Sequence, residues 1–140
     1  MSNKASELIL DAFNLVENNK ANFIDQNETE ATYAPKIEKS ETKINWNDSA
    51  DKIVAKINAL NPNPGCWFNF LGSRFKIIKA KEVPANEKPG KILDDNFTIA
   101  CSKNAIQILE LKKEGKKIMT VQEFLKGNKV EAGIYINSDV

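Results

Sequence analysis

The chain has 140 residues, of which 41% are hydrophobic and 28% are charged, and its formal net charge is +1. This composition is typical of one globular domain, and no apolar run approaches the ~20 residues that a membrane-spanning helix requires. Two cysteines and no histidine argue against a structural zinc site and remove the nucleophilic pairs that use histidine as a base. No secretory signal pattern is visible, so we expect a cytoplasmic protein.

The small net charge conceals two halves of opposite sign. Residues 1–50 carry five Lys and nine Asp or Glu, a balance of −4, whereas residues 51–140 carry fifteen Lys or Arg and ten Asp or Glu, a balance of +5. Seven lysines against three glutamates fall within 103–129. A basic segment of this kind favours a polyanionic partner, although surface lysines are usually no more than solvated side chains.

The first predicted element is an amphipathic helix. One face of it carries Leu8, Ile9, Ala12, Phe13 and Val16, which recur at helical spacing. A short helix on a polar tether cannot bury such a stripe by itself. We therefore expect it either to fold back on the rest of the chain or to cause weak self-association.

A polar stretch separates this helix from the remainder of the chain. We assign residues 1–30 to the helix and its tether, 31–45 to a linker, and 46–140 to a folded domain. That domain opens with a helix predicted over 47–60. Pro62 and Pro64 end the helix, because proline can neither continue a helix nor leave the preceding residue helical.

Short strands are predicted after this helix. The pattern changes to alternating or aromatic-rich segments bounded by Gly, Pro or Asp. The segments are 66–71, 75–83, a short piece near 92–93, 97–101, 105–112 and 134–136. Between Ile106/Ile108 and Leu109/Leu111 the apolar phase slips, which predicts a β-bulge.

A short third helix is predicted late in the chain. Thr120 and Glu123 match a capping box, and Phe124 and Leu125 supply its apolar face before Gly127. Several short strands with one small late helix predict a mainly β domain with short helices (α+β). We expect a small, OB-like, partly open Greek-key barrel preceded by a helix and linker, with a two-sheet sandwich as the alternative.

Three stretches of the sequence resemble a known protein family. ATYAPKIEKSETKINW (31–46), IVAKINALNPNPGCWF (53–68) and LKKEGKKIMTVQEFLKG (111–127) resemble, in order and spacing, the C-terminal region of methionyl-tRNA formyltransferases. The first helix is similar to the end of that family's catalytic domain. The three motifs are specific as a set, although none of them would be specific alone.

The resemblance implies both an activity and its partners. Enzymes of this family transfer a formyl group from 10-formyltetrahydrofolate to methionyl-initiator-tRNA for translation initiation. Their N-terminal catalytic domain carries an Asn, His and Asp set, and their C-terminal barrel helps to hold the tRNA. Because this chain has no histidine, it cannot contain that set. We therefore expect no cofactor in this chain, and we expect initiator tRNA and the catalytic domain as its partners.

The basic turn is the first candidate tRNA contact. Lys112, Lys113, Lys116 and Lys117 flank a glycine, and Lys126 follows the short helix. Ammonium groups on a turn can bind backbone phosphates, which gives affinity and salt dependence with little sequence selection. The alternative is a solvated hairpin end.

The linker supplies a second group of candidates. Lys36, Lys39 and Lys43 lie in a strip that, in this family, passes near the cleft between the domains. An extended segment points alternate residues to opposite sides, so Lys36 and Lys39 need not face the same way. A solvated linker is the alternative.

Aromatic residues of the first strand have two interpretations. Trp67, Phe68 and Phe70 could stack on nucleobases or fill the barrel core. Trp67 and Phe68 are adjacent, so one of these rings must point away from the other. Trp46 is expected in the core, and Cys66 and Cys101 are expected as buried free thiols.

Two other functions remain open from the sequence. The domain could belong to another folate-dependent formyltransferase, acting on sugar nucleotides or on formyltetrahydrofolate, or it could be purely structural. The basic turn favours tRNA over both. Salt-sensitive tRNA binding would distinguish a tRNA-binding domain from these two alternatives.

Overall fold

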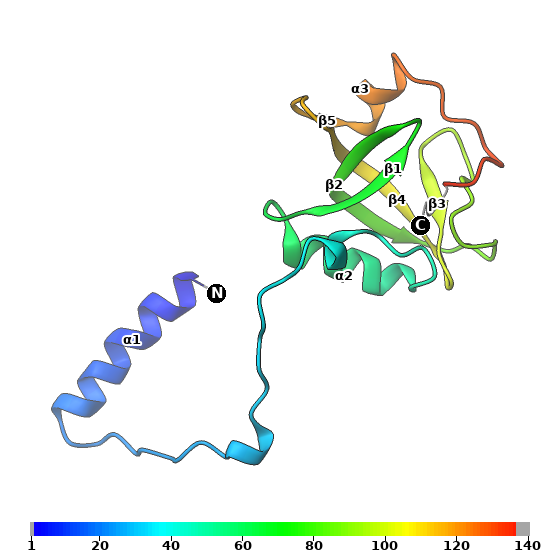
Figure 1. The fold of residues 1–140 in the computed structure, drawn as a ribbon. Coiled ribbons are helices and arrows are strands. Elements are labelled where there is room, and N and C mark those ends of the chain that lie inside the picture. Colours follow the sequence, from blue (N-terminus) through cyan, green and yellow to red (C-terminus); the bar gives the residue numbers. More distant parts are fainter. Residues whose placement is uncertain (1, 137–140) are drawn as a thin grey trace. The chain divides into compact units, whose positions relative to one another are not determined.

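Figure 1 shows the computed structural model of the chain, which describes residues 2–136. The chain divides into two compact units, Met1–Pro35 and Lys36–Val140. The candidate site lies entirely within the second unit.

The first unit contains the predicted amphipathic helix, α1 (Ser2–Glu17), and a single 3-10 turn, η1 (Glu28–Glu30). The apolar stripe of α1 is open within this unit: Leu8 is 64% exposed and Phe13 is 63% exposed. Among residues 2–136, no helix is both long and apolar enough to cross a membrane.

The second unit begins with a 3-10 turn, η2 (Ser40–Thr42), followed by α2 (Ala50–Leu60). One face of α2 is buried through Ala50, Ile53, Ile57 and Leu60, as the predicted periodicity requires. The helix starts three residues later than predicted, because residues 45–48 form turns in which the Asn45 side chain accepts from the Asn47 amide at 3.2 Å.

All strand pairs in the sheet are antiparallel. The strands are β1 (Cys66–Phe70), β2 (Ser73–Val83), β3 (Thr98–Ala100), β4 (Ala105–Lys113) and β5 (Ile118–Thr120), and α3 (Val121–Leu125) follows the last of them. Their order is β1-β2-β4-β3, with β5 also paired to β4. This open sheet confirms the mainly β class with short helices, and the two-sheet sandwich is wrong for residues 2–136.

The predicted bulge lies in the middle of the pairing between β2 and β4. The register runs from Ile77 opposite Leu111, through Lys79 opposite Glu110, to Ala80 opposite Ile108. One extra residue therefore sits on each strand, Ile78 on β2 and Leu109 on β4. Such bulges bend a sheet and increase its twist, which keeps Ile108 and Leu111 on the buried face despite the phase slip.

Aromatic rings fill the interior between the sheet and its helices. Phe68 lies against Trp46, Phe75 and Phe97 at centroid separations of 5.7, 6.0 and 5.9 Å. Phe124 of α3 closes the cluster, 5.8 Å from Phe97. Trp46 is 4% exposed, which confirms its predicted place in the core.

Both cysteines are buried free thiols, as predicted. Burial raises the pKa of the Cys66 thiol, and it raises the pKa of the Cys101 thiol to about 11. Neither thiol is therefore a thiolate near neutral pH, so neither has the reactivity of a catalytic cysteine.

The predicted last strand is wrong as a regular strand. Residues 134–136 make a single bridge, between Tyr135 and Lys91. The amide of Ile136 donates to the carbonyl of Gly90, and the amide of Ile92 donates to the carbonyl of Ile134, each at 2.8 Å. The partner segment is too short and irregular to extend a ladder, so the alternation in Ile134–Ile136 produces only local pairing.

Candidate nucleic-acid interface

A row of outward-facing side chains crosses three neighbouring strands. Trp67 on β1 is paired with Lys76 on β2, and Lys76 is paired with Lys112 on β4. Residues directly opposite one another share a face of the sheet. The flanking residues Phe68 and Phe75 are buried, so the alternation along β1 and β2 places this row on the other face.

Cations approach the Trp67 ring from both edges of β1. The Arg74 guanidinium carbon lies 4.0 Å from the ring centroid, and the Lys43 ammonium nitrogen lies 5.8 Å from it. Lys43 reaches the ring from the segment bridged to Trp67, whereas Arg74 comes from β2 on the opposite edge. Both separations fall within the range of cation–π attraction, about 6 Å.

The Trp67 ring is also held by a hydrogen bond. Its indole nitrogen donates to the Thr42 hydroxyl at 3.0 Å, and that hydroxyl donates to the carbonyl of Lys39 at 2.7 Å. Thr42 is only 3% exposed. The buried hydroxyl therefore links the orientation of the indole to the position of the η2 turn, which carries Lys39.

The Lys76 side chain is positioned by the turn before β1. Its ammonium nitrogen donates to the carbonyl of Pro64 at 2.7 Å. Gly65 has φ +78°, and an added Cβ there would lie 3.2 Å from the Lys76 Cδ. A larger residue would strain the backbone and crowd this stem, so Gly65 allows Lys76 to lie across the turn.

Two adjoining pockets open along these side chains. One, of about 390 Å³, is lined in part by Lys39, Asn63, Trp67, Arg74 and Lys76. The other, of about 330 Å³, is lined by Arg74, Lys76, Lys112, Glu114 and Gly115. Arg74 and Lys76 line both, so the linker and the basic turn meet along one continuous surface. We call the surface formed by Lys39, Trp67, Arg74, Lys76 and Lys112 the basic face.

The cations of the basic face have no acidic partners. Over the described part of the chain, residues 2–136, no carboxylate forms an ion pair with Lys39, Arg74, Lys76 or Lys112. Glu114 lines the second pocket without pairing with any of these four. Unpaired positive charges beside a hollow are suited to phosphate oxygens, which are strong hydrogen-bond acceptors.

Comparison with known proteins agrees with the motifs read from the sequence. Residues 36–129 match the family described as the formyl transferase C-terminal domain. The chain belongs to this family.

Named relatives of this formyl transferase C-terminal domain include two bacterial enzymes. It is 38% identical over 135 residues to a methionyl-tRNA formyltransferase of Pelagibacter ubique, covering 96% of this chain and 44% of that protein. It is 41% identical over 102 residues to one of Paramagnetospirillum magneticum, covering 73% and 33%. The chain therefore spans less than half the length of these relatives, and the resemblance noted in the sequence is confirmed.

A solved structure supports the fold alone. HypX from Aquifex aeolicus in complex with tetrahydrofolic acid superposes with a TM-score of 0.63 at 23% identity, covering 92% of this chain and 26% of that chain. The arrangement of an open antiparallel sheet with short helices therefore recurs in that protein.

The four lysines of the basic turn do not share one surface of this formyl transferase domain. Lys112 is exposed on the basic face, but Lys113 is paired with Phe75 on the opposite side, and its ammonium nitrogen lies 5.9 Å from the Phe75 ring centroid. Lys116 and Lys117 are exposed in the β4–β5 turn, where Gly115 has φ +73°. The turn thus projects two lysines beyond the sheet.

The remaining predicted lysines also differ in position, and only two of them lie near Trp67. Lys39 lines the Trp67 pocket, and Lys43 lies at the Trp67 ring. Lys36 is exposed at the start of the second unit, and Lys126 is exposed at the end of α3. Neither Lys36 nor Lys126 lines either of the two pockets of the basic face.

Sequence reasoning missed Lys76 and drew no conclusion from Arg74. Both flank Phe75 at alternate positions of β2, and both turn outward when Phe75 turns inward. A signal was present in the order Arg-Phe-Lys-Ile, because period-2 alternation assigns the charged pair to one face. What the sequence could not supply was the pairing of that face with Trp67 and Lys112.

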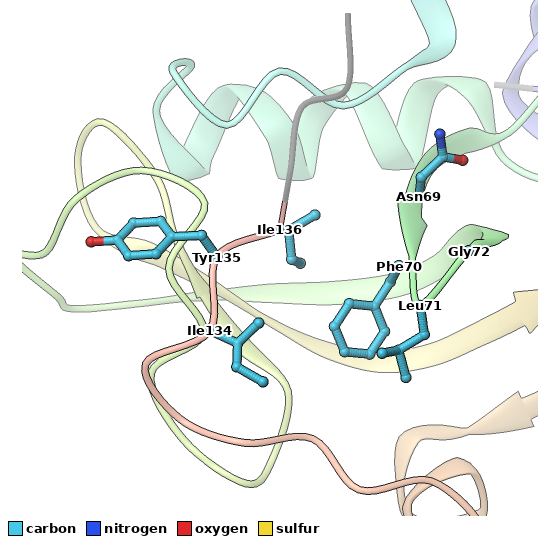
Figure 2. Close-up of a pocket in the computed structure, with 7 residues that line it drawn as sticks. All are labelled: Asn69, Phe70, Leu71, Gly72, Ile134, Tyr135 and Ile136. Atoms are coloured by element: carbon cyan, nitrogen blue, oxygen red, sulfur yellow. The ribbon is translucent and has the colours of Figure 1, made fainter.

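A third pocket has a different chemical character. Figure 2 shows it between the turn that joins β1 to β2 and the segment 134–136. Its volume is about 420 Å³, and its lining, which includes Phe70, Leu71, Ile134 and Ile136, carries no charged side chain. This hollow is unsuited to a polyanion.

Proposed function

We propose that this chain is the tRNA-binding C-terminal part of a methionyl-tRNA formyltransferase, which transfers a formyl group from 10-formyltetrahydrofolate to methionyl-initiator-tRNA. The relatives that carry this name, and the match to the formyl transferase C-terminal domain, support the enzyme class. The catalytic groups are expected in the partner catalytic domain, since this chain has no histidine. Such a role belongs in the cytoplasm.

The observation that carries the proposal is the continuity of the basic face. Lys39 comes from the linker, Arg74 and Lys76 come from β2, and Lys112 comes from β4, yet the two adjoining pockets join all four. A continuous group of unpaired cations from the linker and two strands can follow a nucleic-acid backbone, whereas scattered lysines contribute only a diffuse field. This arrangement favours a tRNA partner over a purely structural role.

The test is the affinity of the purified chain for tRNA across a salt series. Four phosphate contacts predict a log–log slope of about −2.8 to −3.6, from roughly −0.7 to −0.9 per contact. Replacing Lys39 and Lys112 with glutamine removes two contacts without reversing charge. We expect the slope to become about 1.4 to 1.8 units shallower.

A charge-matched control keeps this test specific. Lys81→Gln with Lys88→Gln removes two exposed lysines that line neither pocket of the basic face, and it should leave the slope nearly unchanged. Lys116→Gln with Lys117→Gln then measures what the turn adds separately. Equal slopes in all variants, or no tRNA binding at low salt, would leave a structural domain or another formyltransferase as the better assignment.

A further inference from the structure

The pocket beside Trp67 combines three kinds of lining, of which a phosphate site alone requires only the positive charge. Trp67 and Pro64 supply flat apolar surfaces, Lys39 and Lys76 supply positive charge, and the Asn63 side chain supplies an amide. In the described part of the chain, that amide has no hydrogen-bond partner. A volume of about 390 Å³ is near the lower end of the range for small-ligand sites, roughly 300–1,000 Å³.

The guanidinium of Arg74 gives this pocket a flat cationic platform. The guanidinium carbon lies 4.0 Å from the Trp67 ring centroid, and Arg74 itself is exposed. The guanidinium is therefore accessible to a ligand beside the Trp67 ring. Unpaired bases stack on aromatic rings and on arginine planes, and they present their edges to amides.

From these features we propose that the pocket holds one unpaired nucleotide of an RNA. Its base stacks on the Trp67–Arg74 pair, and its phosphate lies between Lys39 and Lys76. This inference rests on the proposed function, because it assigns one unpaired nucleotide of the bound tRNA to a place on the basic face. Thr42 acts as a positioning residue, since its hydroxyl fixes the indole.

A comparison of single-stranded and duplex RNA tests the inference. The full 140-residue chain is titrated with labelled single-stranded RNA about eight nucleotides long, within the span of an OB-type surface, and with the duplex of the same sequence. Trp67→Leu removes the aromatic ring without changing the charge of the pocket. Arg74→Lys keeps the positive charge but removes the planar guanidinium. Each should weaken single-strand binding about tenfold or more and duplex binding by less than about twofold.

A matched control and a direct probe complete the design. Tyr135→Leu removes an exposed aromatic that does not line this pocket and should bind both RNAs as the unsubstituted chain does. The Trp67 indole N–H resonance, assigned by its absence in Trp67→Leu, should shift when adenosine 5′-monophosphate is added and stay in place with inorganic phosphate. The resonance of the buried Trp46 should respond to neither.

The outcomes separate the two proposals. Single-strand-selective loss in both variants, with the nucleotide-specific indole shift, supports the nucleotide pocket. Unchanged or equal effects on both RNAs, while tRNA binding keeps its steep salt slope, overturn the pocket and leave the proposed function standing. Absence of any RNA binding by the unsubstituted chain overturns both.

Discussion

The hydroxyl of Thr42 holds the Trp67 indole of the proposed site, and replacing it with a methyl group is a direct test of that geometry. Thr42→Val keeps the shape of the side chain but removes the hydrogen bond from the Trp67 indole and the hydrogen bond to the Lys39 carbonyl, which span 3.0 and 2.7 Å. Thr42 is 3% exposed, so water cannot replace the hydroxyl without rearrangement.

The expected loss of stability follows from those two contacts. Each hydrogen bond contributes about 1 kcal/mol net to the free energy of unfolding. The additional buried methyl group of valine offsets roughly 0.8 kcal/mol of that loss. The free energy of unfolding should therefore fall by about 1 kcal/mol, as measured by urea titration. The Trp67 indole N–H resonance should move toward the position of a non-hydrogen-bonded indole, and affinity for single-stranded RNA should fall with it.

Thr42→Ser is the matched control for this prediction. It keeps both hydrogen bonds and loses one buried methyl group, so it should cost a similar ~0.8 kcal/mol. The two variants therefore differ in the indole resonance and in RNA affinity rather than in stability. An indole resonance that is the same in Thr42→Val as in the unsubstituted chain would refute the hydrogen bond and the positioning role built on it.

Three further predictions concern the cap, the thiols and the first helix. Thr120→Ala removes the capping box with Glu123, so the free energy of unfolding should fall by about 1 kcal/mol in urea titration, whereas Thr120→Ser should restore most of it. Because the native pKa of Cys101 is raised to about 11 from about 9, the native state holds its proton where the unfolded state loses it. The free energy of unfolding should therefore decline as pH rises from about 9 to about 11, and urea titrations of Cys101→Ala should show a smaller decline. The exposed stripe of α1 predicts weak self-association: Leu8→Glu with Phe13→Glu should remove any concentration dependence of the sedimentation coefficient, and a monomer at all concentrations in the unsubstituted chain would contradict it.

Much of the fold was determined by short-range patterns in the sequence. The apolar stripe of α1, the two prolines after α2 and the capping box of α3 each depend on residues within a few positions of one another. The bulge was also visible as a slip in the alternation of β4. These features are predictable because helix periodicity, proline sterics and capping are properties of a local segment.

The composition of the basic face was decided by tertiary structure. Lys112 and Lys113 are indistinguishable in sequence, yet the strand register pairs Lys112 with Lys76 and Lys113 with the buried Phe75. Trp67 meets Thr42, a residue 25 positions earlier in the chain. Pairing across strands depends on register, and register is set by packing of the whole core. The sequence by itself therefore determined the family, the helices and the longer strands, and the presence of basic residues. Only the folded sheet decided which cations share a surface with Trp67.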